Sequence, residues 1–346
     1  MDPFPRYDIS RSYDWNYDHP PDPRSVEVPA IPGEWSLCGR QVDSPLGIPA
    51  GPLLNGAWCL YYASLGFDVI TYKTVRSGAR ACYPLPNLQP VQCERMSGGE
   101  ANVSVAQDML GSWAVSFGMP SKSPKKWQQD VQRTRDALPR EKLLVVSAVG
   151  TMQENWTIDD LADDYARCGR LAVDSGADFV EINFSCPNVT TCDGQLYQQP
   201  ADSGLVANRV RQAIGDVPLI VKIGHLTDER TVSELIQHLS SSAQAIAMTN
   251  SIATQVLDED KSVMFDGQVR GICGAATRQA SLSQVEMFAR EISSQEVPVE
   301  IIGVGGIGSA EDVREYLAAG AKATHLATSA MLDPAIALSI RRDWRS

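Results

Sequence analysis

Short runs of apolar and β-branched residues recur along the chain from residue 44 onward. They cover residues 46–50, 68–73, 143–149, 178–184, 219–223, 245–250, 299–304 and 324–328. The runs are nearly continuous in apolar character, whereas a strand with one solvated face would alternate apolar and polar residues. The pattern therefore predicts eight strands that are buried on both faces, as in a parallel sheet.

Segments with helical spacing separate these runs and follow the last one. They cover residues 57–65, 124–138, 158–175, 203–214, 228–241, 277–294, 310–319 and 331–341. Two of them begin with the sequence signal of a helix N-cap, Thr157 with Asp160 and Ser309 with Asp312. Eight strands, each followed by a helix, predict a closed (β/α)8 TIM barrel, an α/β fold, over residues 44–346.

An open, doubly wound sheet also alternates strands and helices, so it is the main competing fold. Its dinucleotide-binding form carries Gly-x-Gly-x-x-Gly after the first strand. Here the first strand is followed by Gly51-Pro-Leu-Leu-Asn-Gly56, which lacks that spacing and favours the barrel. Residues 77–123 and 253–276 are longer insertions, which we expect to form loops over the mouth of the barrel.

Residues 1–43 form a separate, proline-rich segment, with Pro at positions 3, 5, 20, 21, 23, 29 and 32. Proline at this density interrupts regular structure, so we expect an extended N-terminal arm that lies on the barrel or at a subunit interface. A homodimer is the expected assembly.

Composition narrows the class of protein. The 346 residues are 43% hydrophobic and carry a net charge of −12, which argues against a non-specific binder of nucleic acid. No run approaches the roughly 18 apolar residues of a membrane span, and the N-terminus does not resemble a signal peptide. Eight cysteines without a CxxC pair and four scattered histidines predict free thiols, a cytoplasmic location and no metal site.

Polar and glycine residues gather where the predicted strands end, which is where barrels of this kind carry their chemistry. Gly305-Gly306 follows the seventh strand and Thr328-Ser329 follows the eighth, the usual phosphate-binding loops of the fold. Lys73 and Lys222 end apolar strands, which would draw both ammonium groups toward the mouth and require an anion or an electron-rich ring there.

Cys186 lies between Asn183 and Asn188, directly after the fourth strand. Two amides that flank a thiol can hold a planar polar ligand while the thiol moves a proton.

The run Asn183-Phe-Ser-Cys-Pro-Asn188 resembles the Asn-x-Ser-Cys/Ser-Pro-Asn signature of the dihydroorotate dehydrogenase family. Four further stretches fall in the family's order over about residues 44–340: 71–74, 221–222, 250–251 and 302–307. A Cys in the base position is similar to the soluble class 1 enzymes, as is Gln195-Leu196. The stretch from Ala50 to Gly56 is closer in length to the class 2 motif, with leucines in place of its Asp and Lys.

This resemblance implies an FMN-dependent oxidoreductase that acts on a dihydropyrimidine-type ring, dihydroorotate in the family. Cys186 would be the base, and hydride would pass to flavin N5. The substrate-binding residues implied are Asn183, Asn188, Asn250, Ser251 and Lys73. The FMN-binding residues implied are Ala50, Gly51, Lys73, Thr74, Lys222, Gly274, Gly305, Gly306, Thr328 and Ser329. No cysteine cluster for an iron–sulfur centre is present, so a separate electron acceptor is expected.

One position departs from the family. Its substrate loop, Asn-x-Met-Gly, is matched by Val115-Ser-Phe-Gly118, so Val115 replaces an amide expected to touch the substrate. The alternatives are a dihydrouracil or dihydrothymine dehydrogenase-like activity or oxidation of another cyclic enamide. More distant possibilities are a Schiff-base aldolase that uses Lys222 or Lys73, and a flavin-free barrel that only binds a phosphate.

Overall fold

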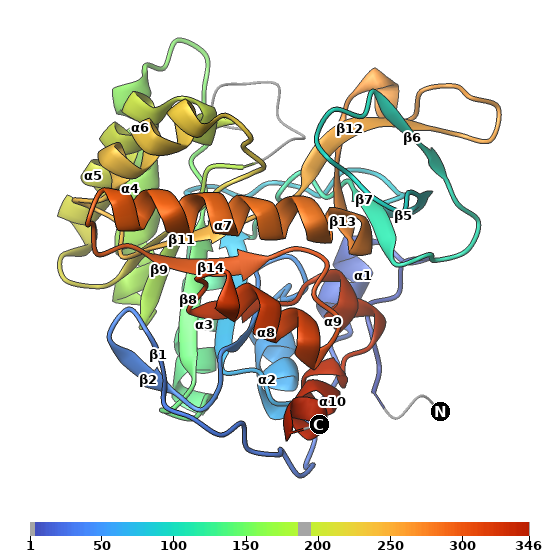
Figure 1. The fold of residues 1–346 in the computed structure, drawn as a ribbon, viewed down its shortest axis with the longest axis horizontal. Helices are drawn as coiled ribbons and strands as arrows, with labels where there is room; N and C mark the ends of the chain where they lie inside the picture. The colour runs from blue at the N-terminus through green and yellow to red at the C-terminus, as the bar shows by residue number, and fades with distance from the viewer. Residues whose placement is uncertain (1–3, 186–194, 346) are drawn as a thin grey trace.

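The computed structural model describes residues 4–185 and 195–345. A closed barrel of eight parallel strands forms the centre of the molecule (Figure 1). In chain order the strands are β3 (Leu46–Ile48), β4 (Val69–Val75), β8 (Leu143–Ala148), β9 (Phe179–Asn183), β10 (Leu219–Lys222), β11 (Ala245–Met248), β14 (Glu300–Val304) and β15 (Ala323–His325). Every predicted apolar run overlaps one of these strands, so the predicted (β/α)8 barrel is confirmed.

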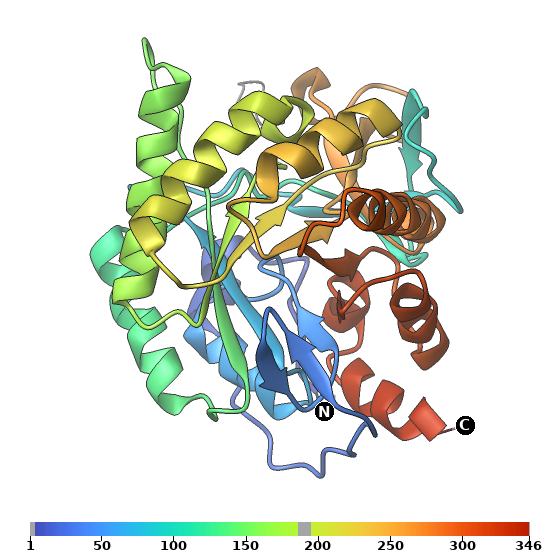
Figure 2. The same cartoon turned by 60° about the vertical axis from the view of Figure 1, so that its left-hand side comes forward.

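Helices connect successive strands and cover the outside of the barrel (Figures 1 and 2). They are α2 (Gly56–Ser64), α3 (Pro124–Ala137), α4 (Ile158–Asp174), α5 (Pro200–Ile214), α6 (Glu229–Leu239), α7 (Arg278–Ser294), α8 (Ala310–Ala318), α9 (Thr328–Leu332) and α10 (Ile336–Arg342). Short 3-10 helices occur at Leu196–Gln198, Phe265–Gly267, Ala275–Thr277 and Asp343–Arg345. Within the described segments, no helix combines the length and the apolar character needed to cross a membrane.

Helix boundaries follow from local chemistry. The side chain of Thr157 accepts from the backbone N–H of Asp160, whose carboxylate accepts from Thr157 in return, as the sequence predicted. The single helix predicted over 331–341 is wrong. The chain forms α9 and α10 instead, because Pro334 lacks an N–H and holds Asp333 in an extended conformation, with φ −129° and ψ 95°.

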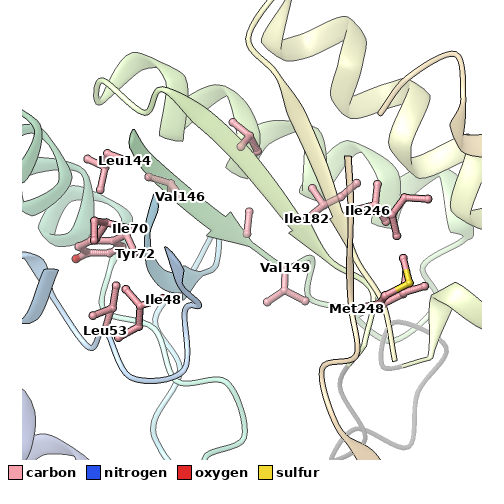
Figure 3. Close-up of a cluster of buried hydrophobic side chains, with 14 of the residues drawn as sticks. Ile48, Leu53, Ile70, Tyr72, Leu144, Val146, Val149, Ile182, Ile246 and Met248 are labelled. Carbon is pink, nitrogen blue, oxygen red and sulfur yellow. The ribbon is translucent and has the colours of Figure 1, made fainter. Parts of the chain in front are cut away.

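The core has two layers, separated by the barrel wall. Side chains that point outward pack under the helices, and Figure 3 shows part of this layer, including Ile70, Leu144, Ile182 and Ile246. Residues at alternate positions fill the barrel interior: Val69, Leu143, Val145, Phe179, Ile220, Ala245, Ala247, Ile302, Val304 and Ala323. This alternation fixes which side chains of each strand reach the interior, including those at the mouth.

The N-terminal arm contains more regular structure than its prolines predicted. It forms helix α1 (Tyr13–Asp18) and an antiparallel pair, β1 (Trp35–Leu37) and β2 (Arg40–Val42). Leu37 and Val42 join the interior cluster, so the hairpin closes the end of the barrel where the strands begin. Helix α1 lies toward the opposite end, with the Tyr13 ring centroid 6.0 Å from that of Phe117.

The two insertions are not simple loops, which corrects the prediction. They supply β5 (Leu88–Gln92), β6 (Asn102–Val105), β7 (Ser112–Val115), β12 (Ile252–Leu257) and β13 (Arg270–Gly274). These strands form a small five-stranded closed sheet beside the mouth of the barrel (Figure 1, upper right). Val115 pairs with Gly271, so the two insertions build one structure although they are far apart in sequence.

Candidate active site at the carboxyl ends of the strands

Two adjoining cavities lie where the barrel strands end. We call them the central cavity and the loop cavity, and they share the wall residues Asn250, Cys273, Val304, Ala327 and Thr328. The predicted site residues in the central cavity are Ala50, Gly51, Lys73, Thr74, Asn183, Lys222, Asn250, Ser251 and Thr328. Those in the loop cavity are Asn250, Gly274, Gly305, Gly306, Thr328 and Ser329. The structure thus brings together all predicted site residues that it describes; Cys186 and Asn188 lie outside the described residues.

A larger cavity lies at the opposite end of the barrel, between the arm and Arg341. Its volume is about 1110 Å³, against about 120 Å³ and 180 Å³ for the two cavities at the mouth. It is not at the carboxyl ends of the strands, where barrels of this class carry their chemistry. Size alone therefore does not locate the candidate site.

Two buried lysines supply positive charge to the central cavity. Lys73 and Lys222 lie on β4 and β10 and are 7% and 5% exposed. The Lys73 ammonium lies 5.4 Å from the centroid of the Phe117 ring and 5.9 Å from that of Tyr13, which stabilises it by cation–π attraction. No carboxylate of the described residues lies within 4.0 Å of Lys222 Nζ. The cavity is therefore suited to an anionic or electron-rich ligand.

Asparagine amides form a polar part of the same cavity wall, where Asn183 of β9 pairs in register with Lys222 of β10. The side-chain Oδ1 of Asn183 accepts from the Ser185 N–H at 3.0 Å, and its Nδ2 lies 3.5 Å from the sulfur of Met119. Asn250 Nδ2 donates to the backbone oxygen of Ser185 at 2.7 Å. These contacts fix both amides at the cavity surface, where they can pair with the N–H and C=O groups of a planar ring.

Cys273 is a second thiol at the site, one that sequence analysis did not select. Its Sγ donates to the backbone oxygen of Asn250 at 3.4 Å, and burial raises the pKa of the thiol to about 12 despite the nearby charge of Lys222. Cys273 is therefore protonated at neutral pH and is unsuited to act as a base. Cys186, the predicted base, directly follows Ser185 of the cavity wall in the sequence.

Glycines in the wall of the loop cavity are required by the backbone conformation and by packing. Gly274 and Gly306 have φ of 108° and 67°, which other residues rarely adopt. A Cβ on Gly306 would lie 2.5 Å from the Cβ of Arg278, and one on Gly274 would lie 2.2 Å from the backbone oxygen of Gly111. At Gly51 a Cβ would meet no atom within 4 Å, so glycine there leaves room for a ligand.

Cationic side chains near the loop cavity are already paired. Arg278 forms ion pairs with Asp312 and with Glu315. The Ser329 hydroxyl donates to the backbone oxygen of Ile307 at 2.6 Å, whereas the buried Thr328 hydroxyl has no partner among the described residues. An anion in this cavity would thus be met mainly by backbone N–H groups and by Thr328.

The small sheet closes one side of the central cavity. The cavity is lined there by Trp113 and Val115 of β7, by Phe117 just after β7, by Leu88 of β5 and by Gly271 of β13. The sequence indicated Gly271 and the loop around Val115, which includes Met119, but it gave no indication of Leu88 and Cys273. Their place in the site depends on the pairing of the two insertions, for which local sequence gives no signal.

One family of known proteins matches nearly the whole chain. A family model described as dihydroorotate dehydrogenase matches residues 34–345. The chain is 30% identical to the dihydroorotate dehydrogenase of Dictyostelium discoideum, over 96% of each chain. It is 25% identical to the dihydroorotate dehydrogenase (quinone) of Bordetella avium strain 197N, over 93% of this chain and 84% of the relative.

A solved structure shares the fold. The crystal structure of dihydroorotate dehydrogenase from Eimeria tenella in complex with ferulenol superposes with a TM-score of 0.74, covering 96% of this chain and 88% of the other. The two sequences are 17% identical, so this likeness supports the barrel architecture.

Proposed function

The chain belongs to the dihydroorotate dehydrogenase family. From that premise we propose that the protein binds FMN in the two cavities and oxidises dihydroorotate to orotate there. Oxidation of dihydroorotate is the family's reaction, so the chain is an oxidoreductase that acts on a CH–CH bond. The family is generally flavin-dependent. The observation that carries the proposal is the convergence of Lys73, Lys222, Asn183 and Asn250 on one cavity that adjoins a glycine-rich loop cavity.

The shape and donor groups of the two cavities fit FMN. The loop cavity suits the phosphate, because the backbone of Gly305 and Gly306 lines it and the Thr328 hydroxyl has no partner among the described residues. The central cavity suits the ring system, since Gly51 leaves open space there and Lys222 offers positive charge. Bound FMN would supply the two-electron acceptor for the hydride that leaves the substrate.

The chain's own residues would orient the substrate and move its proton. Asn183 and Asn250 would pair with the ring amides, with Asn188 and Ser251 completing the polar contacts. Cys186, as the thiolate, would remove the proton from one ring carbon while the hydride leaves the neighbouring carbon. A free thiol has a pKa near 8.5, so we expect the reaction to accelerate as the pH rises toward that range.

Lys73 and Lys222 would stabilise negative charge that develops during the reaction. Both ammonium groups lie in a largely water-excluded cavity, where charge acts more strongly than in water. Lys73 would also pair with the substrate carboxylate. A Schiff-base aldolase would use one lysine as nucleophile, but it gives no role to the two asparagines beside Cys186.

We propose a separate electron acceptor and a cytoplasmic location. Among the relatives, one is named for a quinone and another, from Desulforudis audaxviator, for NAD(+). Steady-state assays with fumarate, a soluble quinone, oxygen and NAD(+) would separate these possibilities.

The cofactor assignment is tested by the purified protein itself. We expect a yellow solution whose heat-released flavin co-migrates with FMN at one equivalent per chain. Thr328→Glu would place a carboxylate in the loop cavity and should yield folded protein that has lost the flavin. A colourless wild-type protein that binds no added FMN, and that borohydride traps covalently with a carbonyl substrate, would instead support the aldolase.

A further inference from the structure

One layer of side chains inside the barrel is polar although it is fully buried. Strands β4, β9, β11 and β15 alternate around the barrel, and their interior residues one level below the mouth are Thr71, Glu181, Ala247 and His325. The level beneath is entirely apolar: Val69, Phe179, Ala245 and Ala323. Thr71, Glu181 and His325 are each at most 1% exposed.

The polar atoms of this layer have no hydrogen-bond partner among the described residues. They are Thr71 Oγ1, both carboxylate oxygens of Glu181 and both ring nitrogens of His325. Buried polar groups are almost always paired, and an isolated buried carboxylate is especially costly. Five such atoms at one level therefore indicate that these groups hydrogen-bond with one another and interact with a charged group nearby.

Lys222 is the neighbouring charge that suits Glu181. Glu181 on β9 pairs in register with Ile220 on β10, two residues before Lys222. With strands about 4.8 Å apart and a rise of about 3.3 Å per residue, the Cα atoms of Glu181 and Lys222 lie about 8 Å apart, within reach of two inward side chains. Burial and the positive charge of Lys222 together lower the pKa of His325 to about 3, so this charge acts on the same layer.

Other charged groups that face the interior have different partners. The Lys73 ammonium lies against the rings of Phe117 and Tyr13. Glu300, at the opposite end of the barrel, accepts from the backbone N–H of Cys38 at 2.7 Å. Among the described interior positions near the mouth, this leaves Glu181 as the carboxylate available to Lys222.

We propose that Glu181 is the counter-charge of Lys222, and that Glu181, Thr71 and His325 form an interior polar layer that holds the Lys222 ammonium toward the central cavity. Thr71 and the imidazole supply hydrogen-bond donors, and Glu181 accepts from them directly or through ordered water. Glu181 is thus a positioning residue, which acts on the ligand through Lys222. The role of Lys222 toward the flavin rests on the proposed function; the ion pair does not.

Two substitutions of Glu181 separate charge from packing. Glu181→Gln keeps the volume and removes the charge, whereas Glu181→Asp keeps the charge and removes a methylene. We expect the Gln variant to weaken FMN binding at least tenfold, measured by quenching of flavin fluorescence, and the Asp variant to lie closer to wild type. If the Asp variant is the weaker binder, packing dominates and the proposal is wrong.

A double-mutant cycle with Lys222→Met tests the pair without reference to turnover. Removing one partner of a buried pair should reduce the folding equilibrium constant by roughly 100-fold or more in urea titrations. In the Lys222→Met background, Glu181→Gln should be neutral or stabilising, because it removes an uncompensated carboxylate. If both single variants fail to fold and only the double variant folds, the pairing is also supported. If the losses in free energy of unfolding of the two single variants add up in the double variant, the pairing is wrong.

A crystal structure of the wild-type holoprotein decides the question if none of these variants folds. The proposal requires the Glu181 carboxylate to contact Lys222 Nζ directly or through one ordered water; contacts to Thr71 and His325 alone would overturn it. Neither the double-mutant cycle nor the crystal structure depends on the substrate. A protein that fails to oxidise dihydroorotate can therefore still show the pair, and an absent pair leaves the proposed function standing.

Discussion

The two ends of the barrel treat buried charge in opposite ways. Where the strands begin, Asp68 is 1% exposed and accepts from Ser44 at 2.5 Å, from Lys142 at 2.6 Å and from Arg341 at 2.6 Å. Where the strands end, Lys222 is similarly buried but no carboxylate of the described residues pairs with it within 4.0 Å, and the Thr328 hydroxyl has no partner there.

This difference indicates that one end of the barrel stabilises the fold and the other end binds ligands. Arg341 also donates to the backbone oxygens of Gly66 and Pro29, so its network joins the C-terminal helix, the barrel and the arm. Such a saturated network holds the fold together and has no capacity left for a ligand. The opposite end keeps charges and hydrogen-bond groups turned to a cavity, as expected where a barrel binds its ligands. Substitutions at the two ends should therefore change different measurements.

The largest effect should come from Cys186→Ala. If Cys186 is the base, anaerobic reduction of bound flavin by dihydroorotate should slow about 10²–10⁴-fold, with the flavin retained and the free energy of unfolding unchanged. Cys273→Ala is the matched control, because its thiol lines the central cavity but has a pKa raised to about 12. Equal rates in wild type and Cys186→Ala would return Cys186 to a packing role.

Asp68→Asn should show the converse behaviour. It leaves the half-buried Lys142 and the buried Arg341 without their carboxylate, so the free energy of unfolding should fall by about 3–5 kcal/mol in urea titrations. Flavin content and turnover per folded molecule should stay unchanged. Asp174→Asn, at the exposed pair with Arg170, is the control and should cost at most about 1 kcal/mol. A loss of flavin in Asp68→Asn would erase the distinction between the two ends.

His325, at the end of the barrel where the strands end, should make the free energy of unfolding of the protein sensitive to acid. Burial and the charge of Lys222 lower its pKa to about 3, whereas an unfolded histidine titrates near 6.5. Between these values the unfolded chain binds the extra proton, so stability is lost as the pH falls below about 6.5, by ~1.4 kcal/mol per pH unit. His325→Asn should flatten this limb of the stability curve, and the exposed His238→Asn should not. Parallel curves for wild type and His325→Asn would contradict the assignment.

Val115→Asn tests the selectivity of the central cavity. Val115 lines that cavity at the position where the family has an amide, so Asn should favour the more polar substrate by about 1–3 kcal/mol. The ratio of kcat/KM for dihydroorotate to that for dihydrouracil should rise accordingly. Val105→Asn, half-buried in the same sheet but outside the cavity, is the control. An unchanged ratio would make Val115 a tolerated difference, and dihydroorotate would remain the better substrate.

The smallest effect should come from the arm. Lys122 pairs with Asp14 at 2.6 Å and lies 4.6 Å from the Tyr17 ring centroid, but Asp14 is largely exposed. Lys122→Met should therefore lower the free energy of unfolding by no more than about 1 kcal/mol. Lys125→Met provides the exposed comparison. A loss of several kcal/mol would mean that the arm depends on this one pair.

Much of the fold could be predicted because buried parallel strands leave a local signal. The run around Val145 is apolar except for Ser147, and the N-caps at Thr157 and Ser309 are local motifs that the structure retains. The pairing of Val115 with Gly271 could not be predicted, since it joins segments more than 150 residues apart. The break before α10 had a signal in Pro334, which the helical spacing on either side concealed.

The candidate site divides in the same way. Lys73, Asn183 and Lys222 could be selected because strand ends of a barrel converge whatever the loops do. Glu181 and His325 lie inside apolar runs, where nothing in sequence distinguishes a structural polar residue from one that acts on the site. Their importance emerges only when alternation places them at one level of the interior.

The central claim is that the mouth of the barrel holds FMN and passes electrons to it from dihydroorotate. Anaerobic stopped-flow mixing of the purified protein with dihydroorotate tests it most directly, with flavin absorbance and orotate formation followed together. We expect saturable bleaching of the flavin, one orotate per flavin reduced, and a rate that rises with pH toward the thiol's range. A protein whose bound FMN stays oxidised at saturating dihydroorotate would contradict the claim.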